Sequence, residues 1–339
     1  MKAKIFNATQ TKRVPLHEVV PLKAPFVVTI DPYDGCNMKC FFCFQSLPRE
    51  QLIESGYNPV TRSMDMEVFN KFCEQLKMFP NKIKVINFGS RSEPTLHKKL
   101  PFMIDTLTHA DVAERIRIIT NGTLLTPKLS SELINAGVTN FVISVNGFSE
   151  NEYKNNCGIK LNFEKYLENL TFLYENKKQC EISIKTLNTI IGERDREVFY
   201  NIFGNICDKI VIENEVKVVQ GFLKKPHNLN EGVQKTSLYF NENKNVEICS
   251  TIFTCMIIRP DGKGKICPKE SYSHSVSFDV SDLFNTWNGE AHKKLLLHNL
   301  RTKRKAEGCR DCGCANRLAF DENYLDPYAD EIIERVMKL

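Results

Sequence analysis

The sequence lacks the features that would place a protein in or across a membrane. No stretch approaches the roughly 18 apolar residues of a membrane-spanning helix. The N-terminal segment MKAKIFNATQTKRVPLHE has no apolar core of signal-peptide length. Net charge is only +5, from 46 basic and 41 acidic residues, which is too mild to indicate nucleic-acid binding. We therefore expect a cytoplasmic protein with no membrane or nucleic-acid partner.

Several common catalytic patterns are also missing. The chain has no glycine-rich phosphate loop, no HExxH motif, no Ser–His–Asp order and no internal repeat, and its seven histidines do not cluster. With 339 residues it is long enough for one large α/β domain and a small appendage. The candidate chemistry must therefore come from other residues.

Cysteine is what this sequence has in excess. Thirteen cysteines are many for a compartment that keeps thiols reduced, so clustered cysteines indicate a metal rather than disulfides. One early group is Cys36, Cys40 and Cys43, and a late group is Cys249, Cys255, Cys267, Cys309, Cys312 and Cys314. The remaining four, Cys73, Cys157, Cys180 and Cys207, stand alone and are expected in the core.

The apolar pattern predicts alternating strands and helices. Short β-branched runs predict buried parallel strands at 25–30, 83–88, 115–120, 141–145, 181–187 and 209–213. Amphipathic stretches predict helices at 65–78, begun by the N-cap Asp65, and at 100–108, 127–136, 163–176 and 195–206. Six strands are too few for a closed barrel, so we expect an α/β fold with a partial, TIM-like (β/α)6 barrel over residues 25–220. In such folds the chemistry lies at the C-terminal ends of the strands.

The rest of the chain divides by composition. Residues 1–24 are expected to be an N-terminal extension, and the polar residues 221–245 a linker. Residues 246–315 carry the late cysteines, with a hairpin predicted from strands near 253–258 and 264–267 around the Asp261–Gly262 turn. Residues 316–339 form a tail that is helical from 329 onward.

The early cysteine group directly follows the first strand. Three thiolates at the spacing of Cys36, Cys40 and Cys43 can each hold one iron of a [4Fe–4S] cluster. The fourth iron then has no protein ligand, and an open metal position is typical of a catalytic site. A zinc knuckle is the alternative, but zinc prefers four protein ligands and only three cluster here.

This CxxxCxxC pattern after a first strand resembles the radical S-adenosylmethionine (SAM) superfamily. The resemblance implies that the open iron binds SAM, and that reduction cleaves SAM to methionine and a 5′-deoxyadenosyl radical. It also implies that Phe42, just before the third cysteine, contacts adenine. A flavodoxin- or ferredoxin-type reductant is the implied partner.

Further stretches at strand ends resemble the same family. Phe88–Pro94 resembles a Gly-Gly-Glu-Pro motif, which implies SAM contacts for Ser92 and Glu93, although Ser92 stands where glycine is usual. Thr120–Asn121–Gly122 and Ser144–Val145–Asn146–Gly147 follow, and imply SAM contacts for Asn121 and Ser144. Asn146 replaces the aspartate of many relatives, so its role stays open. Lys185 either neutralises the SAM carboxylate or faces solvent.

The late cysteine group resembles a SPASM/twitch appendage with one auxiliary [4Fe–4S] cluster. The resemblance implies that its ligands are Cys249, Cys267, Cys309 and Cys312. Cys255 or Cys314 are alternative ligands, and a structural zinc ribbon is the alternative site. The basic residues Arg301, Lys303, Arg304 and Lys305 form a solvated helix end, or else steer a phosphorylated substrate or a reductase.

The substrate is expected to be a small polyhydroxylated molecule such as a sugar, an aminocyclitol or a nucleotide sugar. Peptide maturases of this kind usually carry a leader-binding domain, whereas only 35 residues precede Cys36. By analogy with twitch-type alcohol dehydrogenases, we expect two-electron oxidation of an alcohol, with both cysteine groups flanking one pocket at the barrel mouth. A peptide or protein maturase is the alternative, and an electron carrier is a third hypothesis that the SAM motifs disfavour. The sequence reveals neither a catalytic base nor an oligomeric state.

Overall fold

The computed structural model describes residues 1–6, 13–54, 57, 63–192, 196–214, 238–239, 246–267, 275–305, 309, 312, 314–317 and 320–339. The predicted linker at 221–245 lies outside these residues except for Leu238 and Tyr239.

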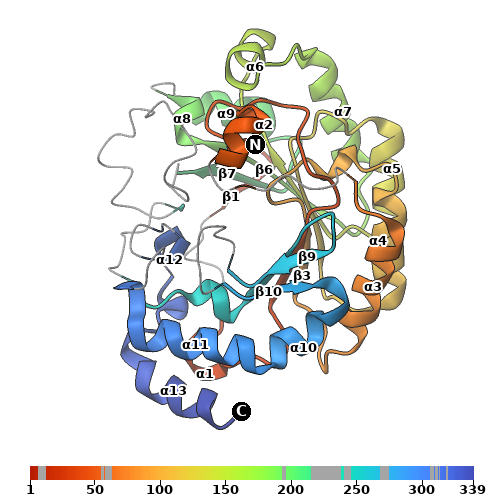
Figure 1. Ribbon diagram of the computed structural model, residues 1–339. Helices are drawn as coiled ribbons and strands as arrows, with labels where there is room; N and C mark the ends of the chain where they lie inside the picture. The colour runs from red at the N-terminus through yellow and green to blue at the C-terminus, as the bar shows by residue number, and fades with distance from the viewer. Residues whose placement is uncertain are drawn as a thin grey trace.

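A twisted sheet forms the centre of the molecule (Figure 1). Its described strands run in the order β1-β7-β6-β5-β4-β3-β2-β8-β9-β10. All six strands predicted from sequence are present: β2 (Val27–Ile30), β3 (Val85–Phe88), β4 (Ile116–Thr120), β5 (Asn140–Ser144), β6 (Glu181–Leu187) and β7 (Lys209–Glu213). They pair in parallel, each with its successor. The prediction of an open α/β sheet is confirmed.

Both edges of this parallel sheet carry strands that the sequence did not place there. β1 (Lys4–Ile5) pairs with β7, so the expected N-terminal extension contributes to the sheet. β8 (Cys255–Ile258) pairs in parallel with β2, and β9 (Lys263–Lys265) and β10 (Ser277–Asp279) follow antiparallel. The predicted hairpin exists, and it extends the barrel sheet because the free edge of β2 offers unpaired backbone groups.

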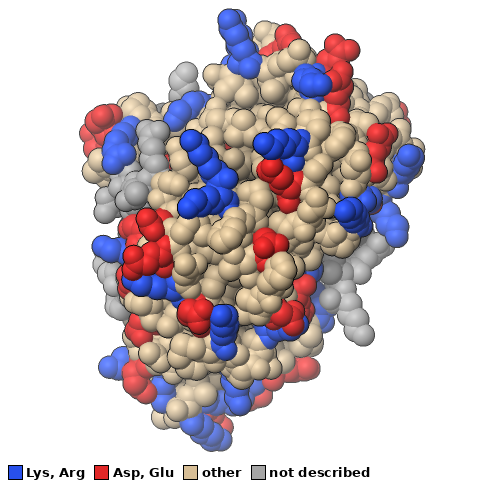
Figure 2. All heavy atoms as spheres, turned by 90° about the vertical axis from the view of Figure 1, so that its right-hand side faces the viewer, with Lys and Arg blue, Asp and Glu red and all other residues tan. Residues whose placement is uncertain are grey.

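Helices cover the outer face of the sheet. They are α3 (Met66–Lys77), α4 (Leu100–Ala110), α5 (Pro127–Asn135), α6 (Glu150–Cys157), α7 (Phe163–Glu175) and α9 (Arg196–Phe203). Asp65 caps α3 by accepting a hydrogen bond from the amide of Glu67, as its sequence predicts. Figure 2 shows basic and acidic side chains interspersed over the face on the right of Figure 1, without a large area of one sign.

The other helical segments are shorter or belong to the C-terminal part. These are α1 (Leu16–Val19), α2 (Arg49–Glu54), α8 (Asn188–Ile191), α10 (Leu283–Asn288), α11 (Glu290–Thr302), α12 (Cys314–Arg317) and α13 (Ala329–Met337). Single 3-10 turns lie at Phe44–Ser46, Pro94–Leu96, Ser250–Phe253, Val280–Asp282, Lys303–Lys305, Asp321–Asn323 and Asp326–Tyr328. Within the described residues, no helix is long and apolar enough to cross a membrane.

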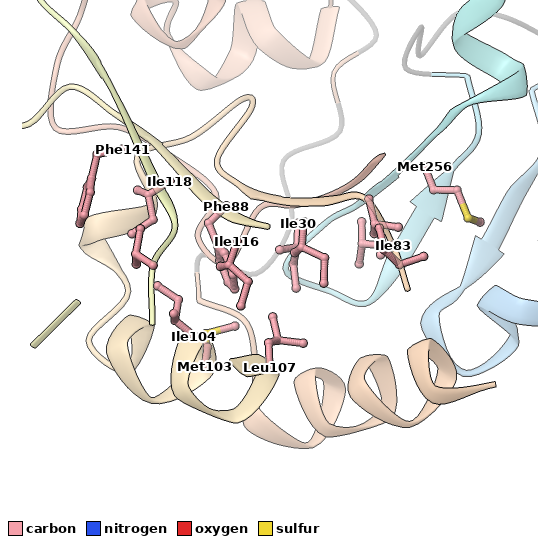
Figure 3. Close-up of a cluster of buried hydrophobic side chains, with 14 of the residues drawn as sticks. Ile30, Ile83, Phe88, Met103, Ile104, Leu107, Ile116, Ile118, Phe141 and Met256 are labelled. Carbon is pink, nitrogen blue, oxygen red and sulfur yellow. The ribbon is translucent and has the colours of Figure 1, made fainter. Parts of the chain in front are cut away.

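The main core lies between the sheet and the helices that cover its outer face. Ile30, Phe88 and Ile118 are fully buried and point toward Met103 and Ile104 of α4 (Figure 3). Since side chains alternate along a strand, the residues between them point to the opposite, inner face of the sheet. The four isolated cysteines, Cys73, Cys157, Cys180 and Cys207, are buried as predicted.

Strand direction decides where the late cysteines enter the fold. β8 runs parallel to β2, with Cys255 beside Val27, so the chain enters β8 at the edge where the parallel strands begin. It leaves β9 at the same edge, because β9 is antiparallel to β8. Cys249 and Cys267 flank the hairpin at that edge, whereas Cys36 follows the other end of β2. The expectation that both groups flank one pocket at the C-terminal mouth is therefore wrong.

Candidate active site

The early cysteines lie on the loop that follows β2, at the C-terminal edge of the parallel strands. This loop is fixed to the end of α6 by two backbone hydrogen bonds. Lys39 donates its amide to the carbonyl of Cys157 (2.7 Å), and Phe41 donates to Asn156 (2.9 Å). The amide of Cys43 donates to the carbonyl of Cys40 (2.9 Å), which tightens the loop between the second and third cysteines.

The three sulfurs are close enough to influence one another's ionisation. Burial, with smaller contributions from the charges of Glu93 and Cys40, raises the pKa of Cys36 to about 11. Burial likewise raises the pKa of Cys43 to about 12, with Cys40 and Cys36 adding to the effect. Contact with the thiol of Cys157, and then burial, raises the pKa of Cys40 well above its ordinary value.

Such a group of thiols suits an iron–sulfur cluster. One of these neighbouring thiols, Cys40, is buried and the other two are partly buried, so they resist ionisation by themselves, and iron supplies the positive charge that holds them as thiolates. Cys36, Cys40 and Cys43 would then be the cluster ligands. No three Cys, His, Asp or Glu side chains of the described residues lie close enough together to bind a single metal ion.

Cluster-free protein should show these raised pKa values as slow alkylation. Under anaerobic conditions at pH 8, we expect iodoacetamide to modify Cys36 roughly 100-fold more slowly in the folded chain than in urea. At pH values below the pKa, each unit of rising pH increases the thiolate fraction about tenfold. The alkylation rate in the folded chain should therefore rise about tenfold per pH unit. Peptide mass spectrometry measures both rates, and equal rates in the folded and unfolded chain would contradict the burial of this thiol.

Glu93 is buried, with only 2% of its surface exposed, at the end of β3. One carboxylate oxygen accepts hydrogen bonds from the amide and hydroxyl of Thr95 (3.1 and 2.6 Å) and from the hydroxyl of Thr120 (2.6 Å). The other accepts the amide of Asn121 (2.7 Å). Burial raises the pKa of Glu93, while these donors oppose the shift. Glu93 thus joins the ends of β3 and β4, and its contact with SAM stays a prediction.

Asp31 is a site residue that sequence reasoning missed. It is buried directly after β2, and burial raises its pKa. It accepts hydrogen bonds from the amides of Ser90 (2.7 Å) and Arg91 (3.2 Å) and from the hydroxyl of Ser92 (3.2 Å). Asp31 therefore shapes the 90–93 loop and engages Ser92. An acidic residue at the C-terminal end of the first strand was the available signal.

Asn121 connects the third strand end to the cysteine loop. Its side-chain NH2 group points to the sulfur of Cys36 (3.7 Å) and the side-chain oxygen of Asn37 (2.8 Å). Its side-chain oxygen accepts from the amide and hydroxyl of Thr123 (2.9 and 2.7 Å), which fixes the orientation of the carboxamide. The structure brings Asn121 next to Cys36, and its contact with SAM stays a prediction.

The ends of β5 to β7 carry further polar groups. Ser144 ends β5, beside Lys185 in register. Lys185 forms an ion pair with the buried Glu213 of β7 (2.7 Å), which the sequence did not suggest. Asn146 is buried just beyond β5, and its side-chain NH2 points to the sulfur of Cys40 (3.5 Å).

A cavity of about 590 Å³ opens beside the cysteine loop. It is lined by Phe41, Glu152, Asn155, Asn156, Thr189, Ile190, Ile191 and Gly192. Phe41, rather than Phe42, lines this cavity. The rings of Phe41 and Phe42 pack edge to face, with their centroids 5.2 Å apart. The adenine contact of Phe42 stays a prediction.

The late cysteines are partly brought together. Burial raises the pKa of Cys249 to about 11, and Cys312 and Cys309 add to the rise, so these three lie near one another. The amide of Cys312 donates to the carbonyl of Cys309 (3.1 Å). Cys267 is half-buried two residues beyond β9, and Cys255 begins β8. In the basic run, Lys303 pairs with Glu247 (2.8 Å) and Arg301 contacts the sulfur of Met337.

The family of the barrel segment is shown by a sequence match. Residues 30–198 match the model of the Radical SAM superfamily. This segment contains the cysteine loop and the ends of β2 to β6, but not β7. Residues 30–198 therefore form a radical SAM domain, and proteins of this family bind a [4Fe–4S] cluster and SAM.

Two curated relatives cover parts of the chain. One is the tungsten-containing aldehyde ferredoxin oxidoreductase cofactor-modifying protein of Pyrococcus furiosus, 34% identical over 103 residues, which are 30% of this chain and 26% of that protein. The other is an uncharacterised protein of Methanocaldococcus jannaschii, 24% identical over 216 residues, which are 58% of this chain and 47% of that protein. The matches thus span less than half of either relative.

Three solved structures share the fold at low identity. SuiB of Streptococcus suis bound to S-adenosylmethionine has a TM-score of 0.61 at 16% identity, over 89% of this chain and 73% of that one. anSMEcpe with bound AdoMet (SAM) has a TM-score of 0.56 at 16% identity, over 92% of this chain and 98% of that one. BtrN in complex with AdoMet and 2-DOIA has a TM-score of 0.51 at 15% identity, over 88% of this chain and 98% of that one.

Proposed function

We propose that this radical SAM enzyme oxidises an alcohol group of a small polyhydroxylated substrate, such as a sugar, an aminocyclitol or a nucleotide sugar. An auxiliary [4Fe–4S] cluster held by Cys249, Cys267, Cys309 and Cys312 accepts the electron in this proposal. The main support is a row of polar side chains across the inner face of the sheet.

This row follows the strand register. Thr29 lies beside Asn87, Asn87 beside Arg117, Arg117 beside Asn140, and Asn140 beside Glu181. The Nε of Arg117 donates to the side-chain oxygen of Asn87 (2.7 Å), and the Asn140 side chain donates to Glu181 (3.3 Å). The neighbours Ile30, Phe88 and Ile118 point to the helices, so the row faces inward. Hydrogen-bonding groups on an inner face suit a substrate with many hydroxyl groups.

The position of the late cysteines supports an electron acceptor across the barrel from the SAM site. Cys249, Cys309 and Cys312 gather on the C-terminal part, which joins the sheet through β8 beside β2. The early cysteines lie beyond the other end of β2. A substrate on the inner face would therefore have one cysteine group toward each end.

The proposed reaction balances as follows. A hydrogen atom passes from the carbinol carbon of the substrate to the 5′-deoxyadenosyl radical, and the hydroxyl proton passes to a base or to water. The remaining electron leaves for the auxiliary cluster, and the carbon–oxygen double bond of a ketone forms. The substrate thereby loses two electrons and two protons.

The solved relatives support two substrate classes. BtrN, with the small molecule 2-DOIA bound, matches over nearly its whole length and supports the proposal. SuiB has been solved with the precursor peptide SuiA, and anSMEcpe with the Cp18Cys peptide, at TM-scores of 0.51 and 0.54. These two favour the alternative, a peptide or protein maturase.

Isotope transfer tests the proposal. Reconstituted, dithionite-reduced protein is incubated with SAM and a panel of sugars, aminocyclitols and nucleotide sugars deuterated at ring carbinol carbons. We expect deuterium in 5′-deoxyadenosine and one SAM consumed per ketone formed, both measured by mass spectrometry. The Cys309→Ser/Cys312→Ser variant should still cleave SAM but form no ketone. Deuterium transfer only from a labelled peptide, or a product at the oxidation level of the substrate, would refute the dehydrogenase function.

A further inference from the structure

Two buried carboxamides point at two of the three cysteine sulfurs of the SAM site. Asn121 points at Cys36 (3.7 Å) and Asn146 at Cys40 (3.5 Å). They come from the ends of different strands, β4 and β5, so the fold, rather than local sequence, brings them to the loop. Only 7% of Asn121 and 6% of Asn146 is exposed, which leaves water little access to either contact.

Asn146 is held firmly against Cys40. The carbonyl of Asn146 accepts the side-chain NH2 of Asn156 (2.9 Å), one residue before the end of α6. The same end of α6 binds the cysteine loop on both sides of Cys40, through the amides of Lys39 and Phe41. Cys40, Asn146 and the end of α6 therefore form one hydrogen-bonded unit that keeps the amide at the sulfur.

The chemistry fixes which way these amides act. A cluster-bound thiolate can only accept a hydrogen bond, and a carboxamide NH2 can only donate. Reduction adds negative charge to the cluster, so a donor to a ligand sulfur stabilises the reduced state more than the oxidised state. Hydrogen bonds to the sulfurs are among the factors that set cluster reduction potentials.

We propose that Asn146, with Asn121, is a positioning residue that raises the reduction potential of the SAM-binding cluster by donating to its cysteine ligands. Asn146 supplies a neutral donor in a place where a carboxylate would add charge. The inference rests on the assignment of this cluster to Cys36, Cys40 and Cys43.

The test exchanges the amide for an isosteric carboxylate. Reconstituted holoenzyme is titrated at controlled potentials and monitored by electron paramagnetic resonance. The measured quantity is the ratio of reduced to oxidised SAM-binding cluster, which is recognised because its signal changes when SAM is added. Asn146→Asp should shift the ratio of reduced to oxidised cluster at least tenfold toward the oxidised form at a fixed potential. That equals about 59 mV for a one-electron couple. Asn146→Ala, which only removes the donor, should shift it in the same direction by less.

Asn87→Asp is the matched control. Asn87 is also a buried carboxamide on the sheet, but its oxygen accepts from Arg117 and its NH2 points to Thr29. The aspartate adds the same charge without touching a cluster sulfur, and we expect a shift of less than twofold. If Asn87→Asp shifts the ratio of reduced to oxidised cluster as much as Asn146→Asp does, added negative charge anywhere on the sheet explains the effect. That result would overturn the proposal.

A further measurement needs no variant. Pulsed electron paramagnetic resonance on the parent protein, grown with 15N-asparagine, should detect a nitrogen coupled to the reduced cluster. Absence of that coupling, or an unchanged ratio in Asn146→Ala, overturns the proposal even if Asn146→Asp fails to hold iron. A parent protein without iron would instead refute the cluster assignment itself.

Discussion

Replacing Cys36, Cys40 and Cys43 together by alanine is expected to abolish SAM cleavage and to halve the iron content. The parent should hold about eight iron atoms per chain after anaerobic reconstitution, and the variant about four, because a four-iron cluster needs these thiolates. Iron and sulfide assays give the metal content, and chromatography of 5′-deoxyadenosine gives the cleavage. No 5′-deoxyadenosine should form above background.

The chain offers a control with the same number of thiols removed. Cys73, Cys180 and Cys207 are buried in the core, away from the early cysteine loop. Their triple alanine variant should keep about eight iron atoms and its SAM cleavage, provided that it folds. Iron unchanged in the Cys36/Cys40/Cys43 variant would refute the assignment of the SAM-binding cluster. Stoichiometric zinc without iron in that variant would refute the auxiliary cluster.

Replacing Glu93 by alanine is expected to lower the free energy of unfolding by at least about 3 kcal/mol. The substitution leaves four buried donors without their acceptor, and each such donor costs about 1–3 kcal/mol. Three of these donors, from Thr95 and Thr120, share one oxygen, and the fourth is the amide of Asn121. Urea unfolding of the iron-free protein measures the difference, and SAM binding should weaken in the reconstituted variant.

Two variants separate the hydrogen bonds from the loss of a carboxylate as such. Glu93→Gln keeps one oxygen acceptor and should lose less stability than Glu93→Ala. Glu132→Ala removes a half-exposed carboxylate whose Lys128 partner is 4.0 Å away, and it should change stability by less than about 0.5 kcal/mol. If Glu93→Ala is as stable as the parent, the carboxylate does not join the ends of β3 and β4. If it also binds SAM as tightly, the predicted SAM contact is wrong.

Much of the barrel could be predicted because its signals are local. The apolar runs around Val85–Phe88 and Ile116–Thr120 suit buried strands, and Asp65 marks the start of α3 by capping its first turn. The edges were harder to predict. The strand at Lys4–Ile5 is too short to show a periodic pattern. The residues at 255–258 predict a strand, but they do not indicate that its partner is β2.

The order of strands and helices could be read from the sequence, as could the spacing that gathers Cys36, Cys40 and Cys43 on one loop, because residues close in the chain stay close in space. Tertiary structure alone decided which distant groups meet these residues. It brought Asp31 to the loop of Ser92, Asn146 to the sulfur of Cys40, and Cys249 near Cys309 and Cys312. Such contacts depend on strand register and loop packing across scores of residues, and no local pattern records them.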